Sequence, residues 1–345
     1  MATTVTTSVN KNFNGDFEVV IQHRLNGGYE LQYPIVEGGV QWETQRQGAP
    51  GKLTFKVYKD KNRGLSFQEG DAVALRYKDD KTGWMVLFNG YIFTKKRNKD
   101  GWISVTAYDQ LRYFKNKATY VYKNKKASEI VKMISNDYKL PSGTIADTKY
   151  VIGERIEDDQ TLFDIIQNAL DLTLISTTKK YVLYADTTGI CLRDVNDLKT
   201  DHVINSSTAE DFDYTSSIDK ETYNEVELFY DNDETNKREY YHAADMTSMN
   251  NWGRLRLTES IQNPANAQDR VKKMLKLYNQ KTRELKVTNA FGNYRCRAGA
   301  SVIVQLDLGD IEVSNYMLIE KAVHTFNKDE YRMDLTLGGL TEFTE

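Results

Sequence analysis

Hydrophobic and polar residues alternate through the first third of the chain, most clearly between Trp84 and Leu111. Two segments with strand-like alternation, Trp84–Lys95 and Gly101–Tyr108, flank a short polar stretch, and Gly101 suits the backbone turn between them. The pattern therefore predicts a long β-hairpin with a cationic tip. The tip comprises Lys96, Arg97, Asn98, Lys99 and Asp100.

The same alternation with a period of two continues over residues 17–118. Phe17, Val19 and Ile21 would face one side of a sheet, and similar runs recur after turn sequences such as Glu69-Gly70-Asp71. Several short strands at this spacing predict a small barrel or sandwich. We therefore assign residues 17–118 to a first β-barrel domain, preceded by a polar arm at residues 1–16.

The apolar spacing becomes helical in residues 119–200. One helix is expected around Ala127–Tyr138, ended by Pro141 and Gly143, and a second over Gln160–Leu172, with Asp158 or Asp159 as its cap. A short hairpin from Leu174–Ser176 to Tyr181–Ala185 would follow. This region is predicted to be an α+β insert.

Strand patterns resume after a polar linker at residues 201–220. Residues 221–345 are expected to form a second β-barrel domain, interrupted by a helix over 264–282. Asn263 would cap this helix, and Pro264 would be its first residue. The predicted fold class is thus a β-rich α+β multidomain protein, with two barrels and a small insert.

Composition excludes several classes of protein. The 46 Lys and Arg residues nearly balance the 49 Asp and Glu residues, so nucleic-acid binding is not the expected main task. No apolar run approaches the roughly 18 residues of a membrane span, and the N-terminus has no signal-peptide pattern. The two cysteines, Cys191 and Cys296, are too few and too far apart for a disulfide framework or a cysteine-based zinc site.

No catalytic or metal-binding pattern emerges. The four histidines do not share a metal-ligand spacing, and no nucleophile elbow or phosphate-binding loop is present. Asp211 and Asp213 could form an acid/base pair for glycan cleavage, but nothing near them in sequence would raise either pKa. Residues 231–234 favour a solvated hairpin tip over a calcium loop. We expect no enzymatic activity, no cofactor and no metal.

Two basic segments are candidate interaction sites. The first is the hairpin tip, with Lys95, Lys96, Arg97 and Lys99. The second is a predicted strand that begins after Trp252 and carries Arg254 and Arg256. Because tryptophan and arginine dominate interface energetics, this strand could anchor a partner, although simple strand packing explains it equally well.

Several blocks of sequence resemble one family, the baseplate hub proteins of contractile phage tails and of tail-like bacteriocins. The resemblance covers nearly the whole chain in the expected order. The clearest blocks are APGKLTFKV (Ala49–Val57), FNGYIFTKKRNKDGWISVTAYDQLRY (Phe88–Tyr113), ASEIV (Ala127–Val131), LFDIIQNALD (Leu162–Asp171) and WGRLRLTESIQNPANAQDRVKKML (Trp252–Leu275).

The resemblance implies a homotrimeric ring at the end of the tail tube. Each chain of such hubs contributes two tube-like barrels, so that three chains match a sixfold tube to a threefold spike. The implied partners are a second copy of the chain, the tail tube protein, the central spike protein and other baseplate proteins, with wedge or tape-measure contacts. A membrane is not implied, and DNA would be only passing cargo in a true phage. The implied location is a virion or tail-like particle assembled in the bacterial cytoplasm.

Two other classes stay open at this point. Relatives of such hubs are sometimes fused to cell-wall hydrolases, but this chain ends directly after its last predicted strand. A peptidoglycan hydrolase would need a carboxylate pair or a metal site. A glycan-binding module at the tail tip would rest only on the α+β insert and the 22 tyrosines.

Overall fold

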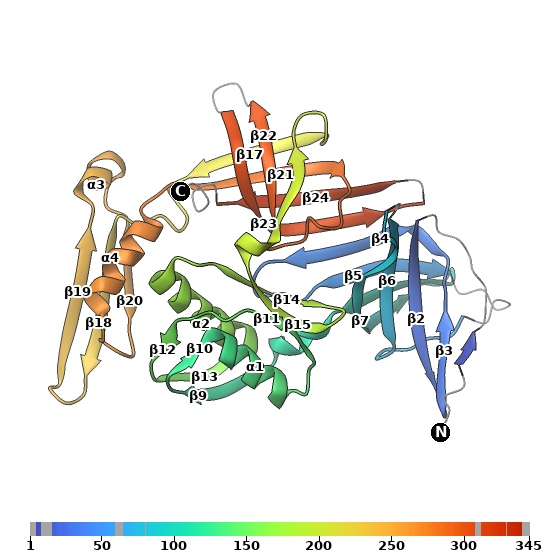
Figure 1. The fold of residues 1–345 in the computed structure, drawn as a ribbon, viewed down its shortest axis with the longest axis horizontal. Helices are drawn as coiled ribbons and strands as arrows, with labels where there is room; N and C mark the ends of the chain where they lie inside the picture. The colour runs from blue at the N-terminus through green and yellow to red at the C-terminus, as the bar shows by residue number, and fades with distance from the viewer. Residues whose placement is uncertain are drawn as a thin grey trace.

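A computed structural model of the protein describes residues 5–7, 16–58, 65–79, 81–307, 312–328 and 330–339. Its main element is a 14-stranded sheet that extends through both β-rich regions of the chain (Figure 1). The N-terminal strands are β1 (Val5–Thr7), β2 (Phe17–Leu25), β3 (Gly28–Gln32), β4 (Val36–Gln45), β5 (Lys52–Tyr58), β6 (Ala72–Asp79), β7 (Gly83–Arg97) and β8 (Trp102–Tyr108). The C-terminal strands are β16 (Lys199–Ile204), β17 (Asp211–Ser217), β21 (Thr282–Phe291), β22 (Ser301–Asp307), β23 (Glu312–Phe326) and β24 (Tyr331–Gly338).

The two halves of this sheet are joined edge to edge. Strand β23 pairs antiparallel with β4, from Lys321 opposite Gln45 to Phe326 opposite Val40. The strand order is β1-β3-β2-β6-β7-β8-β5-β4-β23-β24-β21-β17. Strand β22 pairs with the first half of β23, on the side opposite β24, and β16 pairs with β22. The 14 strands of this sheet do not close on themselves, and no closed barrel appears among the described residues, so the prediction of two barrels is not confirmed within one chain.

Each half of the sheet has its own hydrophobic core. The N-terminal core includes Ile21, Leu53 and Leu75, which alternate with less buried neighbours along their strands. The C-terminal core includes Leu285, Val304 and Leu335. The alternation seen in the sequence thus identifies the buried face in both halves.

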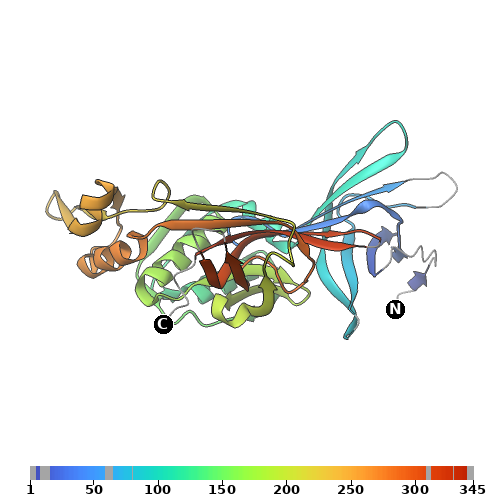
Figure 2. The ribbon, with the colours of Figure 1, turned by 90° about the horizontal axis from the view of Figure 1, so that it is seen from above.

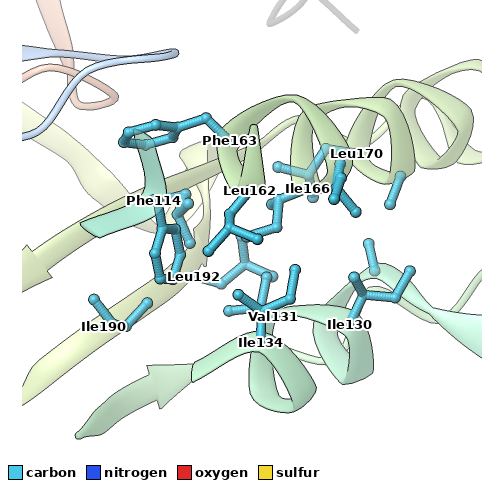
Figure 3. Close-up of a cluster of buried hydrophobic side chains, with 14 of the residues drawn as sticks. Phe114, Ile130, Val131, Ile134, Leu162, Phe163, Ile166, Leu170, Ile190 and Leu192 are labelled. Atoms are coloured by element: carbon cyan, nitrogen blue, oxygen red, sulfur yellow. The ribbon is translucent and has the colours of Figure 1, made fainter. Parts of the chain in front are cut away.

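The insert follows a 3-10 helix, η1 (Gln110–Lys115), and packs around two helices, α1 (Ala127–Asp137) and α2 (Leu162–Thr177). Figure 3 shows the apolar side chains of both helices meeting between them, with Ile190 and Leu192 in the same cluster. The insert strands are β9 (Lys117–Tyr122), β10 (Lys125–Lys126), β11 (Ser142–Ile145), β12 (Val151–Ile152), β13 (Arg155–Thr161), β14 (Tyr181–Asp186) and β15 (Gly189–Asp194). A second 3-10 helix, η2 (Val195–Leu198), leads back to the large sheet.

Helix α2 differs from its prediction at both ends. Its cap is Thr161, whose hydroxyl accepts a hydrogen bond from the Asp164 backbone N–H at 3.1 Å, while Asp158 and Asp159 belong to β13. Its last turn contains Leu174 and Ile175, so the expected hairpin at Leu174–Ser176 does not form. The hairpin is instead β14 paired with β15.

Residues 218–281 form a small separate unit, here called the distal unit. In Figure 1 it lies at the end of the molecule away from β2 and β3. Its strands pair in the order β19-β18-β20, and the strands of this sheet are not part of the large sheet. Its elements are β18 (Glu225–Asn232), β19 (Lys237–Ala244), α3 (Met246–Trp252), β20 (Arg256–Ser260) and α4 (Ala267–Tyr278).

Two details of the chain around the distal unit differ from the sequence prediction. Strand β17 and the end of β16 occupy most of the segment expected to be a linker, residues 201–220. Helix α4 begins at Ala267 and ends at Tyr278, so it is shorter than the predicted 264–282. Asn263 accepts a hydrogen bond from the Ala265 backbone N–H at 2.8 Å, and it therefore caps a turn before the helix.

Candidate interaction surfaces

The tip of the β7–β8 hairpin is the first predicted site. Strands β7 and β8 pair as far as Arg97 opposite Ile103, which confirms the predicted hairpin. The Asn98 side chain closes the turn, since its Oδ1 accepts hydrogen bonds from the backbone N–H groups of Asp100 at 3.1 Å and Trp102 at 2.9 Å. Gly101 takes a positive φ of 89°, a conformation that favours glycine.

The four basic residues of this hairpin have different roles. Lys95 is half-buried, donates a hydrogen bond to the Phe67 carbonyl and lies 4.5 Å from the centre of the Phe67 ring. Lys96, Arg97 and Lys99 are exposed, and they make no ion pair with any described residue. Lys95 therefore links the hairpin to Phe67, and of these four residues only the other three present positive charge that is unpaired within the described residues.

The arginines of the second predicted site have partners within the chain. Glu225 begins β18, directly opposite Arg256 of β20, and its side chain is only 2% exposed. The Arg254 guanidinium forms a bidentate pair with this carboxylate, and His242 Nε2 lies 2.9 Å from Glu225 Oε1. The hydrogen bond from Arg254 is the main cause that lowers the pKa of Glu225 to about 2.

Arg256 and Trp252 complete this cluster. The Arg256 guanidinium pairs with Glu227, and its Nε lies 3.9 Å from Glu225 Oε1. Trp252 is half-buried and ends helix α3, so it does not lie on the arginine strand. The two arginines thus neutralise buried or half-buried acids of the distal unit. The partner-anchoring role given to them from sequence stays a prediction.

Asp211 and Asp213 lie on β17, the edge strand of the large sheet that pairs with β21. They sit two residues apart on one exposed face, opposite Thr288 and Lys286 of β21.

No cluster of acids, histidines or cysteines that could hold a metal ion is present among the described residues. Nor does the described part of the chain contain a helix long and apolar enough to cross a membrane.

Sequence reasoning missed two features of these surfaces. Strand β17 carries its own period-two signal, with Phe212 and Tyr214 between polar residues, but the polar composition of the segment favoured a linker. The buried role of Glu225 had no sequence signal, because an acid at the start of a strand looks the same whether it is exposed or paired. Only the approach of Arg254, from the loop between α3 and β20, decides it.

The predicted tip at residues 231–234 comprises the last two residues of β18 and the start of the turn to β19. The Asn232 side chain accepts hydrogen bonds from the backbone N–H groups of Glu234 at 3.0 Å and Thr235 at 3.2 Å. This arrangement confirms the predicted hairpin tip.

Comparison with known proteins decides the family of the chain. Residues 40–338 match the YqbQ-like family. The chain belongs to this family. Among its relatives are the uncharacterized protein YqbQ and the phage-like element PBSX protein XkdQ, both from Bacillus subtilis strain 168. They are 29% and 28% identical to this chain, over 87% of its length and over 91% and 92% of theirs.

A solved structure shares the fold of this YqbQ-like protein. The 43 kDa tail protein of prophage MuSo2 from Shewanella oneidensis has a TM-score of 0.65 at 11% identity, covering 95% of this chain and 100% of that one. At this identity the likeness concerns the fold alone. The resemblance to phage tail proteins that the sequence indicated is therefore confirmed at the level of the fold.

Proposed function

We propose that this protein is a structural hub of a phage tail or tail-like particle. Three copies would form a ring that adapts the sixfold tail tube to a threefold spike and begins the central channel. Membership of the YqbQ-like family and the fold shared with a prophage tail protein support a structural tail role. The hub and its symmetry are our extension of that role.

One observation carries the proposal, namely the edge-to-edge joining of two β regions through β4 and β23. Each half has a separate core but shares the sheet, so one chain presents two β modules in a fixed relation. Three chains would present six such modules, which is what a threefold-to-sixfold adaptor needs. The tube-like barrel would then be completed by contacts between chains in place of closure within one chain.

The partners proposed for this ring are the tail tube protein on one side and the central spike protein on the other. Other baseplate proteins, including wedge or tape-measure components, would contact its periphery. The hairpin tip with Lys96, Arg97 and Lys99 is proposed as one contact surface, and the distal unit with Trp252, Arg254 and Arg256 as another. The protein would be assembled in the bacterial cytoplasm and reside in the particle.

The deciding experiment is a mass measurement of the purified protein, combined with two-dimensional averages from electron microscopy. We expect a trimer mass and ring-shaped averages with threefold symmetry. A monomer at every concentration, together with images of intact tails that place this chain away from the axis, would refute the hub.

A cell-wall role is the alternative. The exposed pair Asp211 and Asp213 is the one observation in its favour, because both carboxylates lie on the same face of β17. A zymogram on peptidoglycan and a cell-wall pull-down would test hydrolysis and binding separately. The hub proposal expects neither clearing of the gel nor retention on the walls.

A further inference from the structure

Strand β17 leaves one edge of the large sheet open. All seven of its residues pair with β21, from Asp211 opposite Thr288 to Ser217 opposite Thr282, and the register does not shift. No strand pairs with its other side among the described residues. The strand, DFDYTSS, also lacks a proline. A regular edge of this kind can accept a partner, because its outward backbone groups are not blocked by a bulge or a ring.

This open edge is negatively charged. Asp213 is exposed and forms no hydrogen bond or ion pair with the described part of the chain. Asp211 accepts only from the neighbouring Phe212 backbone N–H, at 2.8 Å. The nearest base in register, Lys286, has its ammonium 3.5 Å from Glu284. Like charges on two copies of the edge oppose its pairing with itself, so the strand favours a cationic partner.

The tip of the β7–β8 hairpin has the matching charge. Lys96, Arg97 and Lys99 are exposed and unpaired within the described residues, and the nearby acid, Asp100, is hydrogen-bonded to Asn98. The Asn98 turn holds the tip in one shape, which lowers the entropy cost of docking. Figure 2 shows the hairpin projecting from the body of the molecule, in the half of the sheet opposite to β17.

We propose that the tip of the β7–β8 hairpin of one copy docks on the β17 edge of the next copy. This inference rests on the proposed ring. The two complementary surfaces are different patches in opposite halves of one sheet, so they form a head-to-tail contact, which generates a closed ring when the rotation allows it. A second copy is the favoured occupant because the chain itself supplies both charges. Docking of the tip on another tail protein would be a different outcome of the test.

Cysteine crosslinking tests the contact directly. Both native cysteines, Cys191 and Cys296, are buried and give little background reaction. Asp100→Cys places a thiol at the tip and Thr215→Cys places one on the β17 edge, and neither change removes a charge used in the proposal. A short bis-maleimide should link the two single variants only when they are mixed. A chain with both changes should give covalent trimers.

Charge exchange supplies the second test. Reversal of the tip (K96E/R97E/K99E) or of the edge (D211K/D213K) should weaken assembly by about tenfold or more, because like charges then face each other. Combining both reversals in one chain should restore assembly. The matched control is K132E, since Lys132 of α1 is exposed and has no ion-pair partner among the described residues. Circular dichroism would verify that each variant folds.

The outcomes separate this contact from the ring itself. If the wild-type protein is a trimer but the mixed variants do not crosslink and both reversals assemble normally, the contact is refuted while the hub stands. If the wild-type protein is a monomer in every preparation, the ring fails and the contact fails with it. If only reversal of the tip matters, and only in the presence of another tail protein, the occupant is that protein and the inference is wrong.

Discussion

At the scale of single residues, the best-defined electrostatic feature is the carboxylate of Glu225. It is buried beneath Arg254 and His242, and a charge in such a place is tolerated only when it is paired. The lowered pKa of Glu225 means that the folded state holds its ionised form. This pair therefore contributes stability above the ordinary pKa of a glutamate, and loses it as the pH falls through about 2.

Replacing Glu225 with glutamine should lower the free energy of unfolding by about 2 kcal/mol near neutral pH, because charge-assisted hydrogen bonds are lost. The difference in unfolding free energy between this variant and wild type should shrink as the pH falls from about 4.5 toward 2, where the wild-type carboxylate also loses its charge. Urea unfolding at several pH values measures this. Glu227→Gln is the control, since that carboxylate is more exposed. An equal loss at all pH values would contradict the electrostatic account.

His324 lies where the two halves of the sheet are joined. It lies on β23 opposite Trp42 of β4, stacks on that ring at 4.9 Å and is completely buried. Its Nε2 donates to the Cys296 carbonyl at 3.2 Å, and its Nδ1 accepts from the Tyr331 hydroxyl at 2.9 Å. Burial lowers the pKa of His324 to about 4, so the folded protein keeps this imidazole neutral.

Between pH 6.5 and 4 the unfolded chain binds a proton at His324 that the folded chain does not. Stability should therefore fall with decreasing pH, by about 3 kcal/mol from this residue between roughly pH 7 and pH 4. Thermal unfolding across this range measures the slope. The variant His324→Gln should be less stable at neutral pH but show a flatter slope. If stability depends on pH as steeply in this variant as in wild type, groups other than His324 cause the pH dependence.

At the scale of elements, the segment around Gly299 fixes the insert against the large sheet. Gly299 has a φ of +89°, and an added Cβ would lie 2.5 Å from Val182 Cγ2 of β14. Beside it, the Ala298 backbone N–H donates to the Thr44 hydroxyl of β4 at 3.0 Å. Both halves of the sheet and the insert thus meet at one closely packed point.

The substitution Gly299→Ala should destabilise the protein by about 1 to 3 kcal/mol, because it adds overpacking to backbone strain. Gly70→Ala is a matched control, since Gly70 has a similar φ of +86° but open space around its Cβ position. The difference in unfolding free energy between the two variants measures the contact with Val182. If both variants lose the same unfolding free energy, Val182 can move away from the added methyl group, and this contact does not fix the insert against the sheet.

At the scale of the whole molecule, the distal unit is attached in two ways. Two chain segments, residues 218–224 and 279–281, form a neck between the distal unit and the large sheet. Within the neck, the Thr222 hydroxyl donates to the Gln280 carbonyl at 2.9 Å. The unit also contacts the insert. Ile175, near the end of α2, is buried in the core of the distal unit, and the Gln262 amide forms two hydrogen bonds with the Ile156 backbone.

Truncation of Ile175 to alanine should cost about 2 to 4 kcal/mol of packing and loosen the distal unit from the insert. Trypsin should then cut faster after the exposed Lys220 and Lys281, which both lie in the neck, and release residues 221–281. Mass spectrometry of timed digests measures this. Ile156→Ala is the control, because the Ile156 side chain is 54% exposed and Gln262 contacts only its backbone. Equal cleavage in both variants would show that the neck alone holds the unit.

The local pattern of the sequence determined most strands, helices α1 and α2, and the cationic hairpin, because alternation and helical spacing record which side of an element is buried. It could not determine which strands pair. The β4–β23 join, the separate sheet of the distal unit and the pairing of Glu225 with Arg254 bring together residues far apart in the chain. Such contacts depend on the packing of whole elements, which no local pattern records, and only the tertiary structure decides them.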